Sequence, residues 1–176
     1  MKKSSIFSIA TTFTLMHEGC PAVHFHSAIS AHFRTAIDIV GSSDGIVDAM
    51  DNFPTRYLLN ETAVKKKIPL FHGAIRGLYG QATTIIPGTT PCLRCIFPNA
   101  PPREVFPVVG VTPGFIGMIQ ATEVLKYLLH DGRLLTNRLF LWDGLEAHAE
   151  EIIVERNLAC PVCGKGKAGT TVRKNK

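Results

Sequence analysis

Two Cys-x-x-Cys pairs are the residues whose type and spacing most clearly predict chemistry. Cys92 and Cys95 form the first pair, and Cys160 and Cys163 form the second. A two-residue spacer lets the backbone turn back so that both sulfurs face one ion, and two pairs can supply the four ligands of a tetrahedral zinc site. We therefore predict a structural zinc site that joins two distant segments. Two separate redox pairs, or a chance occurrence, are the alternatives.

Thiolate ligands must stay reduced, so the zinc prediction favours a reducing compartment and a cytoplasmic protein. The fifth cysteine, Cys20, is most simply a small apolar residue. The basic start and the apolar residues of 6–16 weakly resemble a lipoprotein signal peptide, but His17 and Glu18 fit poorly before a cleavage site. We therefore expect an amphipathic helix over 6–16. A lipid-anchored or secreted protein that uses Cys20 remains the alternative.

Asp51 is the second candidate for chemistry because it follows an apolar run, 46–50, that predicts a buried strand. In open α/β sheets, ligands gather at the carboxyl ends of strands. A carboxylate at that place can hold Mg²⁺ and, through the metal, a phosphate-bearing ligand. The alternative is that Asp51 or Asn52 only caps the turn. Arg56 and Arg76 could face phosphates or lie in solvent.

A match to the pattern GxGxxG at 164–169 does not predict a dinucleotide site. It follows the second cysteine pair and lies in a basic tail, with no predicted strand before it and no helix after it. A phosphate loop needs that strand and helix. We read residues 165–176 as a flexible basic tail and residues 1–164 as an incomplete domain.

The elements that must position these residues alternate between strands and helices. Helices are predicted at 6–16, 28–40, 55–67 and 116–129, and strands at 22–26, 45–50, 69–75, 79–86, 138–142 and 151–155. This order predicts an α/β fold, a partial Rossmann-like sheet with a mixed C-terminal part.

Composition and charge exclude several classes of protein. The chain has 176 residues, which suits one domain, and no apolar stretch long enough for a transmembrane helix. Lys and Arg number 19 and Asp and Glu 14, but the tail holds five of the basic residues and no acidic one, so the body is formally neutral. A nucleic-acid groove is therefore not required. We expect neither a nucleic-acid nor a membrane partner.

An ordered series of motifs carries a resemblance to a known family. The series is Asp48–Tyr57 (DAMDNFPTRY), Gly73–Arg76 (GAIR), Gly80–Gln81, Pro91–Cys95 (PCLRC), Gly110–Gly114 (GVTPG), Gln120–Ala121 and Cys160–Cys163 (CPVC). From about Pro21 to Gly164 the chain resembles the ThiF/MoeB/HesA family, relatives of ubiquitin-activating enzymes. The resemblance implies a Rossmann-like fold that binds ATP and adenylates the C-terminal glycine of a ubiquitin-like sulfur carrier, usually as a homodimer.

The resemblance also assigns site residues. Asp51 matches the aspartate that acts at the Mg-ATP site, and Asn52 and Arg56 fall in the same motif and are expected to line that site. The four cysteines of the two pairs match structural zinc ligands. In the implied reaction a carboxylate attacks the α-phosphate while Mg²⁺ and positive charge stabilise the leaving pyrophosphate, and no protein nucleophile is needed.

Two departures from the family pattern limit this expectation. The initial strand, the glycine-rich phosphate loop and the acidic ribose ligand of the family have no counterpart, so we expect a truncated product or a decayed gene. The crossover 96–114 holds no cysteine, so transfer through a thioester or persulfide there is not expected. Without the missing strands, the strand at 45–50 should have an unpaired edge. We expect one of three outcomes: the segment 22–26 is displaced, it pairs directly with 45–50, or a partner protein covers the edge.

The sequence therefore leaves two main functions open, and with them the question whether this chain is an enzyme. One is an adenylyltransferase domain that is active only if another chain supplies the phosphate loop. The other is a non-catalytic, zinc-stabilised module for dimerisation or carrier docking. We predict that the isolated chain binds ATP weakly or not at all, because backbone amides of the missing loop cradle phosphates in such sites.

Overall fold

A mixed sheet of seven strands forms the centre of the computed structural model, which describes residues 6–9, 24–25, 33–102 and 106–164. The strands are β1 (Ile6–Ile9), β2 (His24–Phe25), β3 (Gly45–Asp48), β4 (Leu70–Arg76), β5 (Tyr79–Ile85), β6 (Arg138–Asp143) and β7 (His148–Ile153). Their order in the sheet is β2-β1-β3-β4-β5-β6-β7. The helices are α1 (Phe33–Val40), α2 (Phe53–Lys66), α3 (Leu93–Ile96) and α4 (Val111–Leu129).

The sheet has a parallel half and an antiparallel half. Strands β2, β1, β3 and β4 run parallel, whereas β5, β6 and β7 each pair antiparallel with the preceding strand. A tight turn joins β4 to β5, and Gly77 at this turn has φ +60°, a left-handed conformation that favours glycine. The strand order reverses between β1 and β3, and in a doubly wound sheet ligands bind at such a point, beyond the carboxyl ends of the strands.

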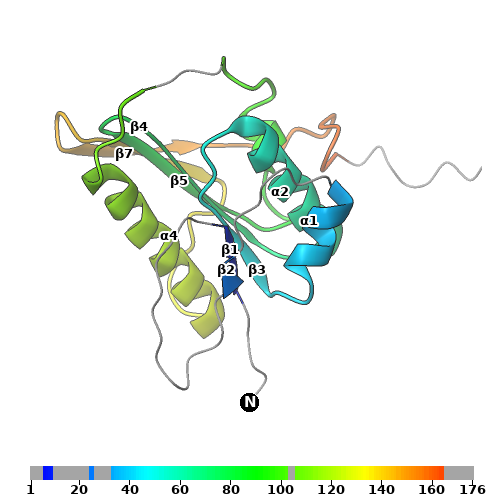
Figure 1. Ribbon diagram of the computed structural model, residues 1–176. Helices are drawn as coiled ribbons and strands as arrows, with labels where there is room; N and C mark the ends of the chain where they lie inside the picture. The colour runs from blue at the N-terminus through cyan, green and yellow to red at the C-terminus, as the bar shows by residue number, and fades with distance from the viewer. Residues whose placement is uncertain (1–5, 10–23, 26–32, 103–105, 165–176) are drawn as a thin grey trace, which may run out of the picture.

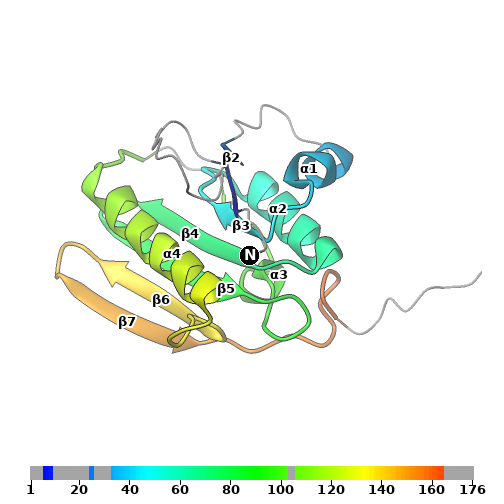
Figure 2. The same ribbon diagram turned by 90° about the horizontal axis from the view of Figure 1, so that it is seen from below.

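The helices cover both faces of the sheet. Helix α4 lies along one face, and α1 and α2 lie on the other (Figures 1 and 2). Between α2 and the sheet a buried apolar core forms, in which Ile46, Leu59 and Leu70 are at most 1% exposed. Helix α4 can approach β4 and β5 closely because a Cβ atom at Gly73 or at Gly80 would fall within 2.6 Å of a side chain of α4.

The predicted helix over 6–16 is wrong where the structure describes it. Residues Ile6–Ile9 form strand β1, which pairs parallel with β3 along its whole length; 10–16 lie outside the described residues. A run of four residues fits both the helical and the strand period, so periodicity alone could not decide. Residues 6–9 form a strand rather than a helix because the backbone groups at the edge of β3 need hydrogen-bond partners, which β1 supplies.

Of the three outcomes expected for the segment 22–26, displacement is the one found. Strand β2, His24–Phe25, does not pair with β3 but lies beyond β1. The edge of β3 that we expected to be unpaired is therefore covered by the chain's own strand β1, and the expectation that the initial strand is missing is wrong. Most other elements occur near their predicted positions, although β7 begins at His148 rather than at 151 and α4 begins at Val111 rather than at 116. Of the predicted helix over 28–40, residues 28–32 lie outside the described residues. Among the described residues, no helix is both long enough and apolar enough to cross a membrane.

Candidate functional site

The four cysteines of the two Cys-x-x-Cys pairs meet in one cluster. Their sulfur atoms all lie within 4.8 Å of one another. The two closest contacts are between pairs, 3.3 Å from Cys95 to Cys163 and 3.6 Å from Cys92 to Cys160. Four sulfurs at the usual zinc distance of about 2.3 Å are separated by about 3.8 Å in a tetrahedron, so this donor set fits zinc. The expected cluster is thus confirmed as a possible metal site.

Local structure explains why the sulfurs converge. Cys92 stands at the N-cap of α3, and the backbone N–H of Cys95 donates to the Cys92 carbonyl at 2.8 Å. The second pair closes a similar turn, in which the Gly164 N–H donates to the Cys160 carbonyl at 2.9 Å. A Cβ atom at Gly164 would lie 2.5 Å from that carbonyl oxygen, so the turn requires glycine at this position.

Burial and backbone amides act oppositely on the cysteine thiols. Burial raises the pKa of Cys92 and of Cys95 above the ordinary value for a thiol. Burial also opposes ionisation of Cys160, but hydrogen bonds from the backbone N–H groups of Cys163 and Val162, together with the neighbouring thiols, lower the pKa of Cys160 to about 7. The cluster therefore contains one thiol that ionises readily near neutral pH, as a metal site needs.

Helix α2 anchors the first cysteine pair. The side-chain oxygen of fully buried Asn60 accepts the Leu93 N–H at 2.9 Å. The Tyr57 hydroxyl donates to the Phe97 carbonyl at 2.9 Å, and the Arg94 guanidinium lies 3.5 Å above the Tyr57 ring. These contacts hold α3 against α2, and the second candidate site lies at the N-terminus of α2.

Asp51 and Asn52 form the turn between β3 and α2. Asn52 is the N-cap of α2, because its side-chain oxygen accepts the Thr55 N–H at 2.9 Å. Its amide group donates to Asp51 Oδ1 at 2.8 Å. Asn52 therefore caps the helix, as in the alternative interpretation, and at the same time orients the Asp51 carboxylate. Asp51 itself is exposed, and its carboxylate lies beyond the carboxyl end of β3.

Arg56, one turn into α2, is buried without sufficient partners. Its side chain is 6% exposed, and its Nη2 donates to the Met50 carbonyl. No described residue supplies a hydrogen bond to its Nε or Nη1. A buried guanidinium with unpaired donors is costly, and an anion at Arg56 would satisfy both the charge and the donors.

A large cleft brings the predicted site residues together. Its volume is about 1160 Å³, and Asp51, Asn52, Arg56 and Arg76 all lie on its wall. The cleft extends over β4, β5 and β6 to β7, and its outer part is lined by Trp142 of β6 and by His148 and Glu150 of β7. This size is sufficient for a nucleotide or an extended peptide segment. The cysteine cluster is not part of the cleft lining, in keeping with a structural rather than a catalytic role.

Below the cleft lies a buried polar network to which the sequence interpretation gave no role. Asp48 and His72 are neighbours across β3 and β4, both fully buried, with 2.6 Å between Asp48 Oδ2 and His72 Nδ1. Gln81 Nε2 lies 3.2 Å from the other ring nitrogen, His72 Nε2. Gln81 reaches the cleft wall. Only strand pairing brings these residues together, so His72 gave no usable spacing in the sequence.

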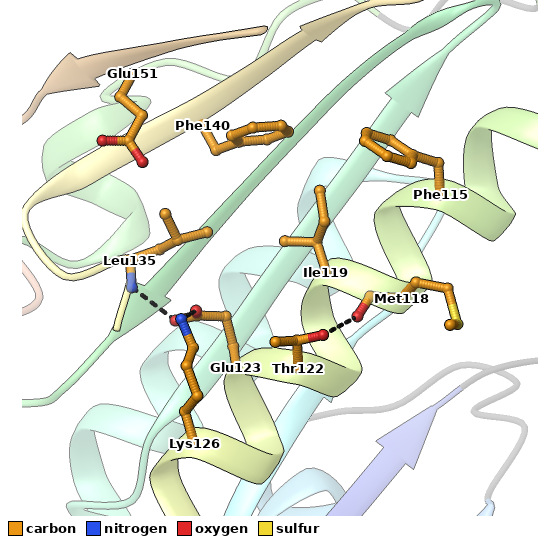
Figure 3. Close-up of a pocket in the computed structure, with 9 residues that line it drawn as sticks. All are labelled: Phe115, Met118, Ile119, Thr122, Glu123, Lys126, Leu135, Phe140 and Glu151. Atoms are coloured by element: carbon orange, nitrogen blue, oxygen red, sulfur yellow. Dashed lines mark hydrogen bonds and ion pairs between the residues drawn. The ribbon is translucent and has the colours of Figure 1, made fainter. Parts of the chain in front are cut away.

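A second, apolar groove lies on the opposite face, between α4 and the outer strands. Its volume is about 350 Å³, and Phe115, Met118, Ile119 and Phe140 form its apolar wall. Figure 3 shows Phe115 of α4 and Phe140 of β6 above this groove, with Glu123 and Lys126 at one end. Glu123 and Lys126 form an ion pair with each other, so the rest of the groove presents mainly apolar surface.

Comparisons with known proteins agree with the motif order. Residues 8–162 match the model of the ThiF family. The chain is 48% identical over 135 residues to a SAMP-activating enzyme E1 of Haloferax volcanii, an alignment that covers 73% of this chain and 50% of that protein. It is 44% identical over 142 residues to a sulfur carrier protein adenylyltransferase of Thermus thermophilus, covering 74% and 52%. The chain thus spans about half the length of these curated relatives.

The fold is also that of a solved structure. E. coli MccB, crystallised with MccA-N7isoASN, superimposes with a TM-score of 0.70 at 17% sequence identity. The match covers 81% of this chain and 46% of that one. At this identity the likeness establishes the architecture alone.

Proposed function

The chain belongs to the ThiF family, and on that premise we propose that its cleft is a site for activating a ubiquitin-like sulfur carrier by adenylyl transfer from ATP. The observation that carries the proposal is the pair formed by the exposed Asp51 carboxylate and the buried Arg56 guanidinium, whose Nε and Nη1 have no hydrogen-bond partner among the described residues, on one cleft wall. Both groups lie beyond the carboxyl end of β3, next to the point at which the strand order reverses. The names of the two relatives, a SAMP-activating enzyme E1 and a sulfur carrier protein adenylyltransferase, support this choice.

The chemistry requires charge stabilisation rather than a protein nucleophile. A C-terminal carboxylate oxygen of the carrier attacks the α-phosphorus of ATP, the bond from that phosphorus to the bridging oxygen breaks, and pyrophosphate leaves. Asp51 would hold the Mg²⁺ that accompanies the phosphates, and that ion would offset negative charge on the leaving group. Arg56 would donate from Nε and Nη1 to an anionic oxygen, either of the carrier carboxylate or of a phosphate. Asn52 would keep the Asp51 carboxylate oriented.

The sequence after β1 argues that phosphate binding by this chain is weak. In doubly wound sheets a glycine-rich turn after the first strand lets backbone N–H groups reach the phosphates. Here β1 is followed by Ala10, Thr11 and Thr12, and the first glycine is Gly19. We therefore expect full activity only when another chain supplies the phosphate loop.

The cysteine cluster completes the proposal as a structural zinc site. Zinc would join α3 to the turn at 160–163 and so fix the part of the chain that packs against α2. It would take no part in adenylyl transfer, because four thiolates leave no open position. We further propose that residues 1–164 form the folded unit, that 165–176 are a basic tail, and that the protein is cytoplasmic.

The proposal is tested by titrating the zinc-loaded chain with a ubiquitin-like carrier protein that ends in Gly-Gly. Affinity should fall at least about tenfold for Arg56→Gln, because a hydrogen-bonded charge pair in the cleft is lost. Arg133→Gln is the matched control, since Arg133 is exposed beyond α4 and outside the cleft. Equal affinity for a carrier without its last two residues, or an Arg56→Gln variant that binds normally, would contradict the proposal.

A second function, dimerisation or carrier docking without catalysis, is favoured by one observation. Exposed apolar side chains of α4 recur at steps of four, three, seven and four residues, forming a stripe of Val111, Phe115, Met118, Leu125 and Leu129. Such a regular apolar stripe on a helix is typical of a seam that packs against a partner. We propose that it joins two copies of the chain. This role is compatible with the activity of the cleft on the other face.

A further inference from the structure

The buried network below the cleft places a hydrogen-bonding side chain at each ring nitrogen of His72. A carboxylate can only accept hydrogen bonds, so the 2.6 Å contact with Asp48 Oδ2 requires the proton on His72 Nδ1. The NH₂ group of Gln81 can only donate, so the 3.2 Å contact requires an acceptor at His72 Nε2. With the Gln81 amide in this orientation, the two contacts are those of an imidazole that carries its proton on Nδ1. The Met50 N–H donates to Asp48 Oδ1 at 3.1 Å and holds the carboxylate in turn.

The structure turns the NH₂ group of the Gln81 amide toward His72, the orientation that this tautomer stabilises. In the sheet His72 pairs with Thr83, so Gln81 of β5 is its diagonal neighbour on the same face. With its NH₂ group turned toward His72, Gln81 keeps its carbonyl oxygen for the cleft that it lines. The reverse orientation would place two acceptors in contact. In this orientation the side-chain oxygen of Gln81 is left as a hydrogen-bond acceptor on the cleft wall.

The position of Gln81 indicates what donor it meets. Asp51 and Arg56 lie at one end of the cleft, and Trp142 and His148 of the outer strands lie at the other. Gln81 belongs to β5, between β4 and β6 in the sheet. An extended chain that enters over the outer strands and ends at Arg56 crosses β5, and its backbone presents N–H donors at regular intervals.

Building on the proposed function, we propose that Gln81 is a positioning residue for the carrier tail. Its side-chain oxygen accepts a hydrogen bond from a backbone N–H of the tail, in an orientation that Asp48 and His72 impose. The contact aligns the tail so that its terminal carboxylate reaches Arg56. It also selects a peptide over ligands that present acceptors at this point, since two facing acceptors repel each other.

The first measurement concerns the network itself and needs no carrier. Nitrogen-15 NMR of the zinc-loaded chain should show His72 with a protonated Nδ1 and an unprotonated Nε2 at pH 7. A protonated Nε2 would overturn the proposal, because Gln81 would then turn its oxygen toward His72. The same spectrum shows whether Gln81→Met, a variant of similar size without the amide, keeps the native arrangement of Asp48 and His72.

The second measurement is a double-mutant cycle, in which one substitution is made in the protein and one in the ligand. A peptide that ends in Gly-Gly is compared with analogues in which one amide of the tail at a time is replaced by an ester, which removes the N–H donor. For wild type one ester should weaken binding roughly five- to tenfold, the effect of one lost hydrogen bond. Gln81→Met should bind the amide peptide as weakly as wild type binds that ester, and the ester should cause no further loss.

The outcomes separate this proposal from the one it rests on. Binding that depends on Arg56 but is equal in wild type and Gln81→Met overturns the role of Gln81 alone. Ester effects of equal size in wild type and Gln81→Met do the same. A peptide that fails to bind any form of the protein overturns the proposed function and, with it, the role of Gln81 in substrate binding.

Discussion

The side chain of Gln120 links helix α4 to two adjacent strands of the sheet. Its side-chain nitrogen donates to the Asp48 carbonyl at 2.8 Å and to the Phe71 carbonyl at 2.9 Å. It is 6% exposed and lies directly over Gly73 of β4. Two backbone acceptors on adjacent strands are thereby satisfied from a helix, which fixes α4 against the strands that carry the buried Asp48 and His72.

This contact predicts that Gly73 cannot be enlarged without cost. In Gly73→Ala the added Cβ would lie 2.4 Å from Gln120 Cδ, so the Gln120 side chain must move and lose its hydrogen bonds. We expect the free energy of unfolding to fall by about 2 kcal/mol, measured by urea denaturation.

Gly114→Ala is the matched control for that substitution. Gly114 lies in exposed surface of α4, and a Cβ there meets nothing within 4 Å. Alanine is favoured over glycine in a helix, so this variant should gain about 0.5–1 kcal/mol. Equal effects of the two substitutions would show that α4 does not pack on β4 as described.

Among the elements, α3 and the turn at 160–163 depend on the four cysteines for their connection. Zinc that binds the folded chain and not the unfolded one should raise the free energy of unfolding by about 4 kcal/mol at a thousandfold excess over its Kd. Removing zinc with a chelator should lower the melting temperature accordingly. Because binding displaces protons from thiols, zinc affinity should fall as the pH falls.

Substitutions of the cysteines provide the test of that assignment. Cys163→Ser should lose tight zinc binding in a thiolate competition assay, because one of four ligands is gone. Cys20→Ser is the control, since Cys20 belongs to neither pair, and it should keep one zinc per chain. Zinc loss in Cys20→Ser, or full retention in Cys163→Ser, would contradict the four-cysteine assignment.

Helices and strands with local signals could be predicted from sequence, and those set by distant pairing could not. Asn52 and Pro54 mark the start of α2, and the cysteine spacing indicates the cluster, because both signals lie within a few residues. The strand β1 could not be found this way, since it is defined by the edge of β3 that it covers. For the same reason Asp51 and Arg56 were candidates, whereas the partnership of Asp48, His72 and Gln81 required the sheet register.

For the whole molecule, the apolar stripe on α4 predicts self-association. A glutamate at Met118 or Leu125, which are 71% and 58% exposed, would place a charge in the proposed seam between copies. Met118→Glu and Leu125→Glu should therefore shift the chain from dimer to monomer in analytical ultracentrifugation. Their melting temperatures at low protein concentration should remain near that of the wild-type monomer, because neither side chain is buried within the chain.

Leu145→Glu is the control for this surface. Leu145 is 62% exposed in the connection between β6 and β7 and lies outside the stripe. It should leave the dimer intact. A wild-type chain that is monomeric at high concentration, or a dimer that only Leu145→Glu disrupts, would exclude the stripe as the seam.

The most direct test of the account as a whole is calorimetric titration of Mg-ATP into the zinc-loaded chain, with Asp51→Asn in parallel. Because Asp51 and Arg56 are present but a glycine-rich turn does not follow β1, we predict a Kd of about 1 mM or weaker for wild type. We predict no detectable binding for Asp51→Asn. Micromolar binding that survives Asp51→Asn would contradict the account, since ATP would then be held at a site that the end of β3 does not form.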